Sequence, residues 1–298
     1  MIFLAKINLN NYHDMKPTDH LTALRPQMET NSFLQYPVMS TLSPSYPRGP
    51  WHYRDVHLLA VTYQSTAEAV RAVVPRPLQP ADGNRATLYW WRFTEVTGFG
   101  PYSEVAHSVD CTFEGQPVSY IFQAFLDSES PTIAGREILG FPKKRGEPEL
   151  KTVREVLTGT LAYGGVQVAL ATMQYRAVDL SDRLAEIEQD LLQTPQLVLK
   201  LLPDVDNHTP KVAQLVRVNQ YDVRLKGAWG GAAELFLVPH VGCPVAALPV
   251  VRVLEGLQLL WDVTLRDGQV VYDYLETERL SDRRQQVTPR DGQVVYAQ

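Results

Sequence analysis

The chain of 298 residues contains little cysteine, since Cys111 and Cys243 are its only two. Neither belongs to a Cys-x-x-Cys motif, so the sequence indicates neither a disulfide framework nor a cysteine-bound zinc site. Sparse cysteine use is typical of proteins in a reducing compartment. We therefore expect a cytoplasmic protein.

Long hydrophobic runs are also missing. The apolar start, residues 1–5, is too short for the core of a signal peptide, because Lys6 follows at once. The most apolar later stretch, residues 241–251, is interrupted by Pro244 and Pro249 and is shorter than a membrane span. We therefore predict no signal peptide and no membrane partner.

The signals of common cofactor and nucleic-acid sites are absent as well. The seven histidines have no metal-ligand spacing, and no glycine-rich phosphate loop follows a predicted strand. The net charge of -5 and the pI near 5.8 argue against binding to a phosphate backbone, and the longest basic run is 143–145. No metal, cofactor or nucleic-acid partner is indicated.

The pattern of the remaining chain predicts a fold with much antiparallel sheet. Short apolar or alternating runs at 56–63, 85–93 and 118–126 are typical of strands. The run 161–168 contains a Gly-Gly pair and predicts a hairpin, because glycine adopts the positive φ angles of a tight turn.

Helices are predicted between these strands. Ser130-Pro131 is expected to open one helix that Gly140 ends, which would place a pair of lysines just beyond its C-terminus. Ser181 is expected to cap another helix, whose apolar face carries Leu184, Ile187 and Leu191, and Thr194-Pro195 is expected to open its continuation.

The segment 135–144 is the most informative for function, because it places Lys143 and Lys144 side by side in an apolar, proline-bounded setting. Burial and a neighbouring cation both disfavour the ammonium form of a lysine. An enclosed pair would therefore favour a neutral, nucleophilic amine on one of the two. Adjacent lysines more often lie in a solvated loop, so the pair alone does not establish catalysis.

Further motifs accompany this pair in a specific order and spacing. They are Tyr46–Trp51, Ala72–Leu78, Gly98–Glu104, Gly135–Glu137, Phe141–Lys144, Leu248–Val250 and Val271–Leu275. Together they resemble the acetoacetate decarboxylase family, from about Tyr46 to Leu275. The resemblance implies an α+β, mainly antiparallel fold, a cone-like closed β-barrel with a flanking sheet and a few helices, assembled as a homo-oligomer.

The same resemblance divides the chain into three parts. Residues 1–44 form a polar N-terminal extension, 45–276 a catalytic domain and 277–298 a C-terminal tail. The tail repeats, at 290–296, the seven residues Arg-Asp-Gly-Gln-Val-Val-Tyr found at 266–272. Two copies are too few to indicate a repeat architecture.

By resemblance, Lys143 is the lysine that forms a Schiff base, and Lys144 is the neighbour that perturbs or frames it. Arg48 and Glu104 fall on the family's active-site arginine and glutamate. A protonated imine accepts the electron pair released when a neighbouring carbon–carbon bond breaks. Arg48 would hold a substrate carboxylate through two parallel hydrogen bonds, and Glu104 would orient the substrate or move protons.

One position departs from the family. Decarboxylases of this family usually carry an acidic residue about fifteen positions before the motif glutamate, where gapless counting gives Tyr89. A phenol donates a hydrogen bond but is normally uncharged at pH 7. We interpret Tyr89 in one of two ways. It is either a substrate-binding residue, whose presence in place of a carboxylate changes the charge and the number of proton-carrying groups around the imine, or a core aromatic residue at the edge of a pocket.

Three functions remain open at this point. The first is a cofactor-independent lyase that decarboxylates a 3-oxo acid, such as acetoacetate, through a lysine imine. The second, prompted by Tyr89, is a relative that uses the same imine for aldol or dehydration chemistry on a 2-oxo acid such as pyruvate. The third is a non-catalytic module that binds a small molecule.

Overall fold

The computed structural model describes residues 34–278, and this part of the chain divides into two units after Ser45. In the first unit, the described residues 34–45 form local turns. Ser45 Oγ, for example, donates a hydrogen bond to the Met39 carbonyl at 2.8 Å. The second unit, which begins at Tyr46, carries the described strands. The tail copy of the repeated heptapeptide lies outside the described residues.

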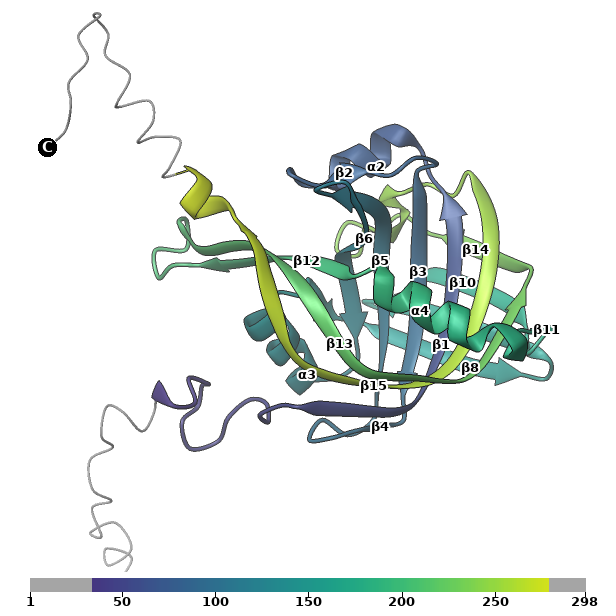
Figure 1. Ribbon diagram of the computed structural model, residues 1–298, viewed down its shortest axis with the longest axis horizontal. Coiled ribbons are helices and arrows are strands. Elements are labelled where there is room, and N and C mark those ends of the chain that lie inside the picture. Colours follow the sequence, from purple (N-terminus) through teal and green to yellow (C-terminus); the bar gives the residue numbers. More distant parts are fainter. Residues whose placement is uncertain (1–33, 279–298) are drawn as a thin grey trace, which may run out of the picture. The chain divides into compact units, whose positions relative to one another are not determined.

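Seven strands of the second unit close into a ring (Figure 1). In ring order they are β5 (Tyr102–Phe113), β3 (Arg85–Phe93), β1 (Trp51–Gln64), β15 (Arg252–Asp273), β13 (Pro210–Gly231), β12 (Gln196–Pro203) and β6 (Gln116–Leu126), which pairs again with β5. All neighbours around the ring are antiparallel except β6 and β12. The expectation of a closed, mainly antiparallel barrel is confirmed.

Shorter strands extend this sheet, and a second sheet flanks it. The extensions are β2 (Gln79–Pro80), β4 (Glu95–Val96), β7 (Lys143–Arg145) and β11 (Val178–Asp179). The second sheet has the order β14 (Ala233–Leu237), β10 (Val166–Gln174), β9 (Val156–Tyr163) and β8 (Glu147–Val153). Gly164 and Gly165, at φ 58° and 80°, form the predicted hairpin between β9 and β10.

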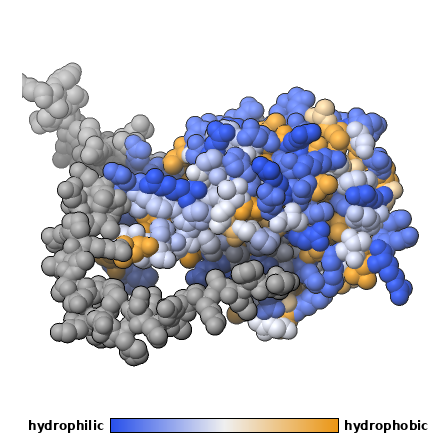
Figure 2. Space-filling model, turned by 90° about the horizontal axis from the view of Figure 1, so that it is seen from below, coloured by the Kyte–Doolittle hydropathy of each residue, from blue (hydrophilic) through white to orange (hydrophobic). Residues whose placement is uncertain are grey.

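The alternation of side chains along the strands produces two apolar cores. On β1, Leu59, Val61 and Tyr63 belong to a core shared with side chains of the second sheet. Leu58 and Ala60, on the other face of the same strand, belong to a core built almost entirely from ring strands, which is the barrel interior. On the face seen in Figure 2, hydrophilic residues predominate and hydrophobic ones are scattered in small groups.

Few helices accompany the strands. Those that lie wholly within the described residues are α2 (Ala67–Val73), α3 (Glu129–Ala134), the π-helix η2 (Gly135–Leu139), the 3₁₀ turns η3 (Ser181–Arg183) and η4 (Val245–Ala247), and α4 (Leu184–Gln193), and residues 274–278 are helical as well. As predicted, Leu184, Ile187 and Leu191 of α4 pack against a core, here the barrel interior. Within residues 34–278, every helix falls short of the length and apolar content needed to cross a bilayer.

Three helix boundaries differ from the prediction. Ser181, expected to cap the helix that carries Leu184, instead begins the 3₁₀ turn η3, and Arg183 occupies the N-cap of α4. The helix expected to open at Ser130-Pro131 begins at Glu129, with Ser128 in the extended cap position, because proline fits the first turn as well as the first residue. The expected continuation after Pro195 is wrong, because residues 196–203 form strand β12. Local propensity is overridden there by pairing with β13 and β6, which completes the ring.

Candidate active site

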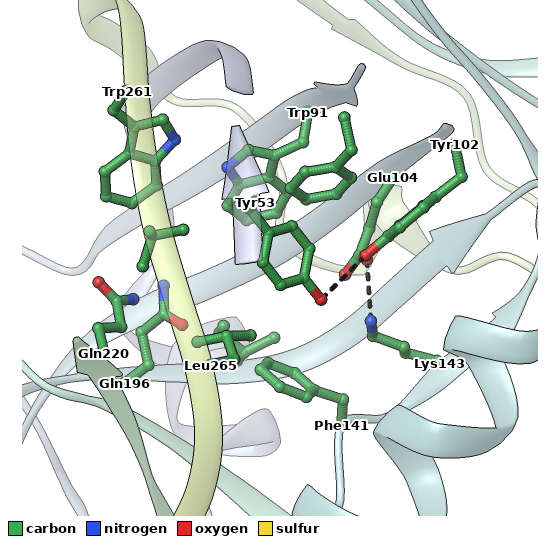
Figure 3. A pocket seen from close by; sticks show the side chains of 13 residues that line it. Tyr53, Trp91, Tyr102, Glu104, Phe141, Lys143, Gln196, Gln220, Trp261 and Leu265 are labelled. Atoms are coloured by element: carbon green, nitrogen blue, oxygen red, sulfur yellow. Dashed lines mark hydrogen bonds and ion pairs between the residues drawn. The ribbon is translucent and has the colours of Figure 1, made fainter. Parts of the chain in front are cut away.

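The barrel encloses a cavity of about 70 Å³ that contains Lys143 and Glu104 (Figure 3). Most of its wall is apolar or aromatic. The lining side chains are Tyr53, Trp91, Phe93, Tyr102, Glu104, Ile121, Phe141, Lys143, Gln196, Gln220, Trp261, Val263 and Leu265. One cation and one carboxylate therefore share an otherwise uncharged, largely aromatic enclosure.

Lys143 enters this cavity because the chain turns sharply after the π-helix. Gly140 ends η2 in the left-handed conformation, at φ 91°, and its N–H donates to the Gly135 carbonyl. A side chain at Gly140 would also strike Lys200, whose Cβ lies 2.3 Å from the position of an added Cβ. The chain then joins β7, which pairs in parallel with β6 and places Lys143 opposite Ala124.

Two neighbours fit closely around Lys143. A Cβ added at Gly135 would lie 2.7 Å from Lys143 Cδ and 2.9 Å from Cε, so only glycine leaves room for the lysine side chain there. Arg136 Nη1 donates to the Lys143 carbonyl at 3.0 Å. A π-helical turn of this kind is frequent at functional sites, and here it brings Gly135 and Arg136 against one lysine.

Lys143 and Glu104 form a buried ion pair. Lys143 Nζ donates to Glu104 Oε2 at 3.0 Å, and the two side chains are only 8% and 6% exposed. Burial of both charges is costly unless they stay together, so the pair fixes the position of each partner. The contact is also short enough to pass a proton between the amine and the carboxylate.

Two tyrosines complete the polar side of the cavity. Tyr102 Oη donates to Tyr53 Oη at 3.4 Å, and Figure 3 shows both hydroxyls beside Glu104. Burial raises the pKa of Tyr53 and of Tyr102, and the negative charge of Glu104 raises both further. Both phenols therefore remain protonated and able to donate hydrogen bonds near neutral pH.

A bulge in β1 aims Tyr53 at the cavity. The register with β15 shifts between Tyr53 and Val56, where Asp55 adopts φ 49°. The extra residue lets both Tyr53 and Val56 point into the barrel although they are an odd number of positions apart. Asp262 Oδ1 accepts the Asp55 backbone N–H at 2.8 Å and holds the bulge.

Lys144 does not line the cavity. Strand alternation turns it to the opposite face of β7, where its Nζ donates to the Gly242 carbonyl at 2.7 Å and lies 5.3 Å from the centre of the Tyr163 ring. Its influence on Lys143 would therefore act through the strand rather than through a shared pocket.

Arg48 and Tyr89 also lie outside the cavity lining. Arg48 is exposed. Tyr89 is partly buried on the same face of β3 as Trp91, on which it stacks with ring centres 4.9 Å apart, and Ser108 Oγ donates to its hydroxyl at 3.3 Å. Burial raises the pKa of Tyr89, so it contributes no negative charge. Of the five residues singled out from the sequence, the structure brings Lys143 and Glu104 together.

Sequence reasoning missed most of the cavity wall. Phe141 and Tyr102 belong to motifs that were recognised but were not assigned a role. Gln196, Gln220 and Trp261 carry no local signal, because they converge only when the ring closes. Within residues 34–278, no group of three or more His, Cys, Asp or Glu side chains is arranged to hold a metal ion.

Comparison with known families gives a clear match. The family model described as acetoacetate decarboxylase (ADC) matches residues 35–275. A Ralstonia nicotianae protein named acetoacetate decarboxylase is 39% identical over 237 residues, which cover 80% of this chain and 94% of that protein. A protein of the same name from Chromobacterium violaceum is 40% identical over 239 residues, with the same coverage.

Solved structures agree. An acetoacetate decarboxylase structure superposes with a TM-score of 0.79 at 31% identity, covering 83% of this chain and 100% of that one. The Legionella pneumophila acetoacetate decarboxylase gives 0.75 at 30% identity, covering 84% and 99%. The enduracididine biosynthesis enzyme MppR, complexed with pyruvate, gives 0.64 at 22% identity, covering 78% and 94%, and shares the fold.

Proposed function

Because the chain belongs to the acetoacetate decarboxylase family, we propose that it is a lyase that decarboxylates a small 3-oxo acid, such as acetoacetate, through a Schiff base on Lys143. The observation that carries the proposal is the position of Lys143 Nζ, buried in an aromatic cavity 3.0 Å from Glu104 Oε2. A buried amine beside a carboxylate has both a nucleophile and a partner for its proton.

The reaction balances as follows for acetoacetate. The neutral amine attacks the ketone carbon, and loss of water gives a protonated imine. The bond between the carboxylate carbon and the adjacent methylene then breaks, carbon dioxide leaves, and the electron pair moves into an enamine with the imine nitrogen as its acceptor. Protonation of the methylene carbon and addition of water to the imine release acetone and restore the amine.

The chain's own groups suit these steps. Glu104 is placed to take a proton from the lysine and to return it while the ketone oxygen leaves as water. The hydroxyl of Tyr53 accepts the proton of Tyr102 and keeps its own proton to donate to an oxygen of the substrate. The aromatic wall places apolar surface around a carboxylate whose charge disappears as carbon dioxide forms, which favours the transition state over the bound acid.

The size of the cavity supports a small substrate. A volume of about 70 Å³ is enough for roughly five to seven water-sized groups. Acetoacetate has seven non-hydrogen atoms, so it would fill this space with little room for solvent.

The test is reductive trapping. Protein incubated with acetoacetate and sodium borohydride should gain one reduced adduct, located by peptide mapping on Lys143, and should release carbon dioxide without borohydride. Lys143→Ala should lose both. The matched control is Lys151→Ala, which removes an exposed lysine paired with Glu149 and should leave both unchanged. An adduct confined to another lysine would contradict the proposal.

The second candidate, aldol or dehydration chemistry on a 2-oxo acid, is favoured by the fact that, among residues 34–278, Glu104 is the only carboxylate that lines the cavity. Trapping of pyruvate on Lys143, with no carbon dioxide released from acetoacetate, would select it. No adduct with any keto acid, and unchanged ligand binding by Lys143→Ala, would leave a non-catalytic binding module.

Homo-oligomeric assembly and a cytoplasmic location remain predictions.

A further inference from the structure

The turn that leads into Lys143 depends on contacts from outside the turn. Beyond η2, the amides of Gly140 and Phe141 both donate to the Gly135 carbonyl, at 2.8 and 2.9 Å. The last carbonyls of a helix have no partner inside the helix. Because the first two amides beyond η2 are already used, a later carbonyl such as that of Ile138 needs a donor from another element.

Lys200 of β12 supplies that donor. Its Nζ donates to the Ile138 carbonyl at 2.9 Å, across 62 positions of the chain. Gln196 and Val198 lie on the inner face of β12, and strand alternation puts Lys200 on the same face. Lysine side chains often bond the last carbonyls of a helix in this way. Lys200 therefore ties the end of η2 to a strand of the ring.

The contact between Lys200 and the turn is close and partly buried. A Cβ added at Gly140 would lie 2.6 Å from Lys200 Cα, so the turn packs directly on the backbone of β12. Lys200 is half-buried, and burial lowers its pKa, while the carboxylate of Glu137 acts in the opposite direction. Glu137 is held in turn by Tyr46, whose hydroxyl donates to its Oε2 at 2.9 Å. Packing and hydrogen bonds together fix η2 against β12.

A second cation connects η2 to the backbone of Lys143. Arg136 Nη1 donates to the Lys143 carbonyl at 3.0 Å, and Arg136 is only two residues before Ile138 in the same short helix. At the far end of its side chain, Lys143 Nζ meets Glu104 Oε2 at 3.0 Å. These contacts form a continuous path from β12 through η2 to the buried ion pair.

We propose that Lys200 and Arg136 are positioning residues that hold η2 and thereby set the geometry of Lys143 relative to Glu104. Lys200 anchors the helix to the ring, and Arg136 passes that constraint to the Lys143 backbone. Neither side chain lines the cavity, so their removal affects the reaction of the amine more than the binding of substrate. This inference rests on the proposed function.

The test removes each donor while keeping most of the length of the side chain. Lys200→Met and Arg136→Met should each lower kcat about 10- to 100-fold, the effect expected when a reacting group shifts by up to about 1 Å. KM should change less than about threefold, and timed borohydride trapping on Lys143 should slow by the same factor as kcat. Lys200→Arg, which keeps a donor for the Ile138 carbonyl, should restore kcat to within about threefold of the original value.

Two control variants lose similar groups away from η2. Lys211→Met removes an exposed lysine paired with Asp204. Arg145→Met removes an arginine from the same strand as Lys143, where its Nη1 donates to the Asp127 carbonyl at 2.6 Å. Both variants should keep the original kcat and trapping rate.

The variant that combines Lys200→Met with Arg136→Met distinguishes one shared path from two independent effects. Its kcat should be close to that of the slower single variant, because residues that act as a unit have non-additive effects. A kcat equal to the product of the two single effects would contradict the shared path. Loss of kcat that only follows the fraction of unfolded protein, measured by urea unfolding, would leave the two cations a structural role alone.

The trapping assay separates this inference from the proposed function. An adduct on Lys143 that forms at the original rate in Lys200→Met and Arg136→Met would overturn the positioning role and leave the proposed function intact. Absence of the adduct from the original protein would overturn both.

Discussion

At the residue scale, the pairing of Lys143 with Glu104 combines a nucleophile and its proton partner in one contact. Glu104→Gln keeps the shape of the side chain but removes the proton acceptor. We expect kcat to fall by about 10²- to 10⁴-fold, the usual contribution of general acid–base catalysis. Borohydride trapping on Lys143 should become slower but still occur, because the amine is still present.

The control for this change is Glu149→Gln, which alters an exposed carboxylate paired with Lys151. Exposed ion pairs contribute little to the free energy of unfolding, so the stability of this variant should stay close to that of the original protein. Its kcat should also be unchanged, because Glu149 lies outside the cavity lining. Full activity of Glu104→Gln would show that the proton moves through another group.

Space around the nucleophile is a second residue-scale requirement. Gly135→Ala would place a methyl group 2.7 Å from Lys143 Cδ and 3.3 Å from Nζ, so the amine must shift. Misplacement by about 1 Å can cost on the order of a hundredfold in rate. We expect kcat/KM to fall at least about tenfold, with the adduct forming correspondingly more slowly in a timed trapping assay.

Gly230→Ala provides the comparison, because its added methyl group would meet Leu180 Cδ1 at an ordinary 3.4 Å. Equal rates for the two glycine variants would mean that the turn at Gly135 adapts and that the close fit does not position the lysine.

At the element scale, a buried histidine joins three strands of the ring. His107 of β5 accepts a hydrogen bond at Nδ1 from Gln123 Nε2 of β6 at 2.9 Å, and its Nε2–H donates to the Tyr63 hydroxyl of β1 at 2.8 Å. Tyr63 also donates to the Leu248 carbonyl at 3.1 Å. These hydrogen bonds to neighbouring strands support a structural role for His107. Its position three residues after Glu104 in the sequence does not make it part of the cavity lining.

The same histidine predicts acid sensitivity. Burial lowers the pKa of His107 to about 3, below the value of about 6.5 in the unfolded chain, so the unfolded state binds the extra proton between these values. Stability from the neutral histidine is complete above pH 6.5 and is lost as the pH falls towards 3. The free energy of unfolding should drop by about 1.4 kcal/mol per pH unit between pH 6 and 4 from this group.

Urea unfolding at a series of pH values measures the effect. His107→Gln should be less stable at pH 7 but should lose most of this dependence on pH, whereas His208→Gln, which changes an exposed histidine, should keep it. An identical slope in His107→Gln and the original protein would assign the acid sensitivity to other groups.

At the scale of the whole barrel, the ring has one weak seam. The pairing of β6 with β12 is parallel and joins only Ser119, Tyr120 and Ile121 to residues 196–198, whereas β1 pairs with β15 from Trp51 to Gln64. Short pairings open more easily than long ones. Amide hydrogen exchange should therefore be faster at residues 196–198 than in the centre of β1.

The seam also carries Gln196, whose side chain lines the cavity that contains Lys143. Amide hydrogen exchange at residues 196–198 can be measured with and without the borohydride-reduced adduct on Lys143. Slower exchange with the adduct would show that an occupied cavity stabilises the seam. Equal protection of β12 and β1 in the free protein would contradict the idea of a weak seam.

The sequence alone determined the features that depend on local chemistry. Strand periodicity, the Gly-Gly hairpin and the end of a helix at Gly140 follow from interactions between residues close in the chain. The motif order identified the family, and Lys143 and Glu104 were both found in this way. Strand alternation would also have predicted that Lys143 and Lys144 face opposite ways, had residues 143–145 been recognised as a strand.

Only the tertiary structure decided which side chains share the cavity. Gln196, Gln220 and Trp261 come from three different strands, and their convergence depends on ring closure and on strand register. The β1 bulge, which brings Tyr53 inside, depends likewise on pairing with β15. Register and closure are set by contacts between residues far apart in the chain, so they leave no periodic or motif signal in the sequence around any one of them.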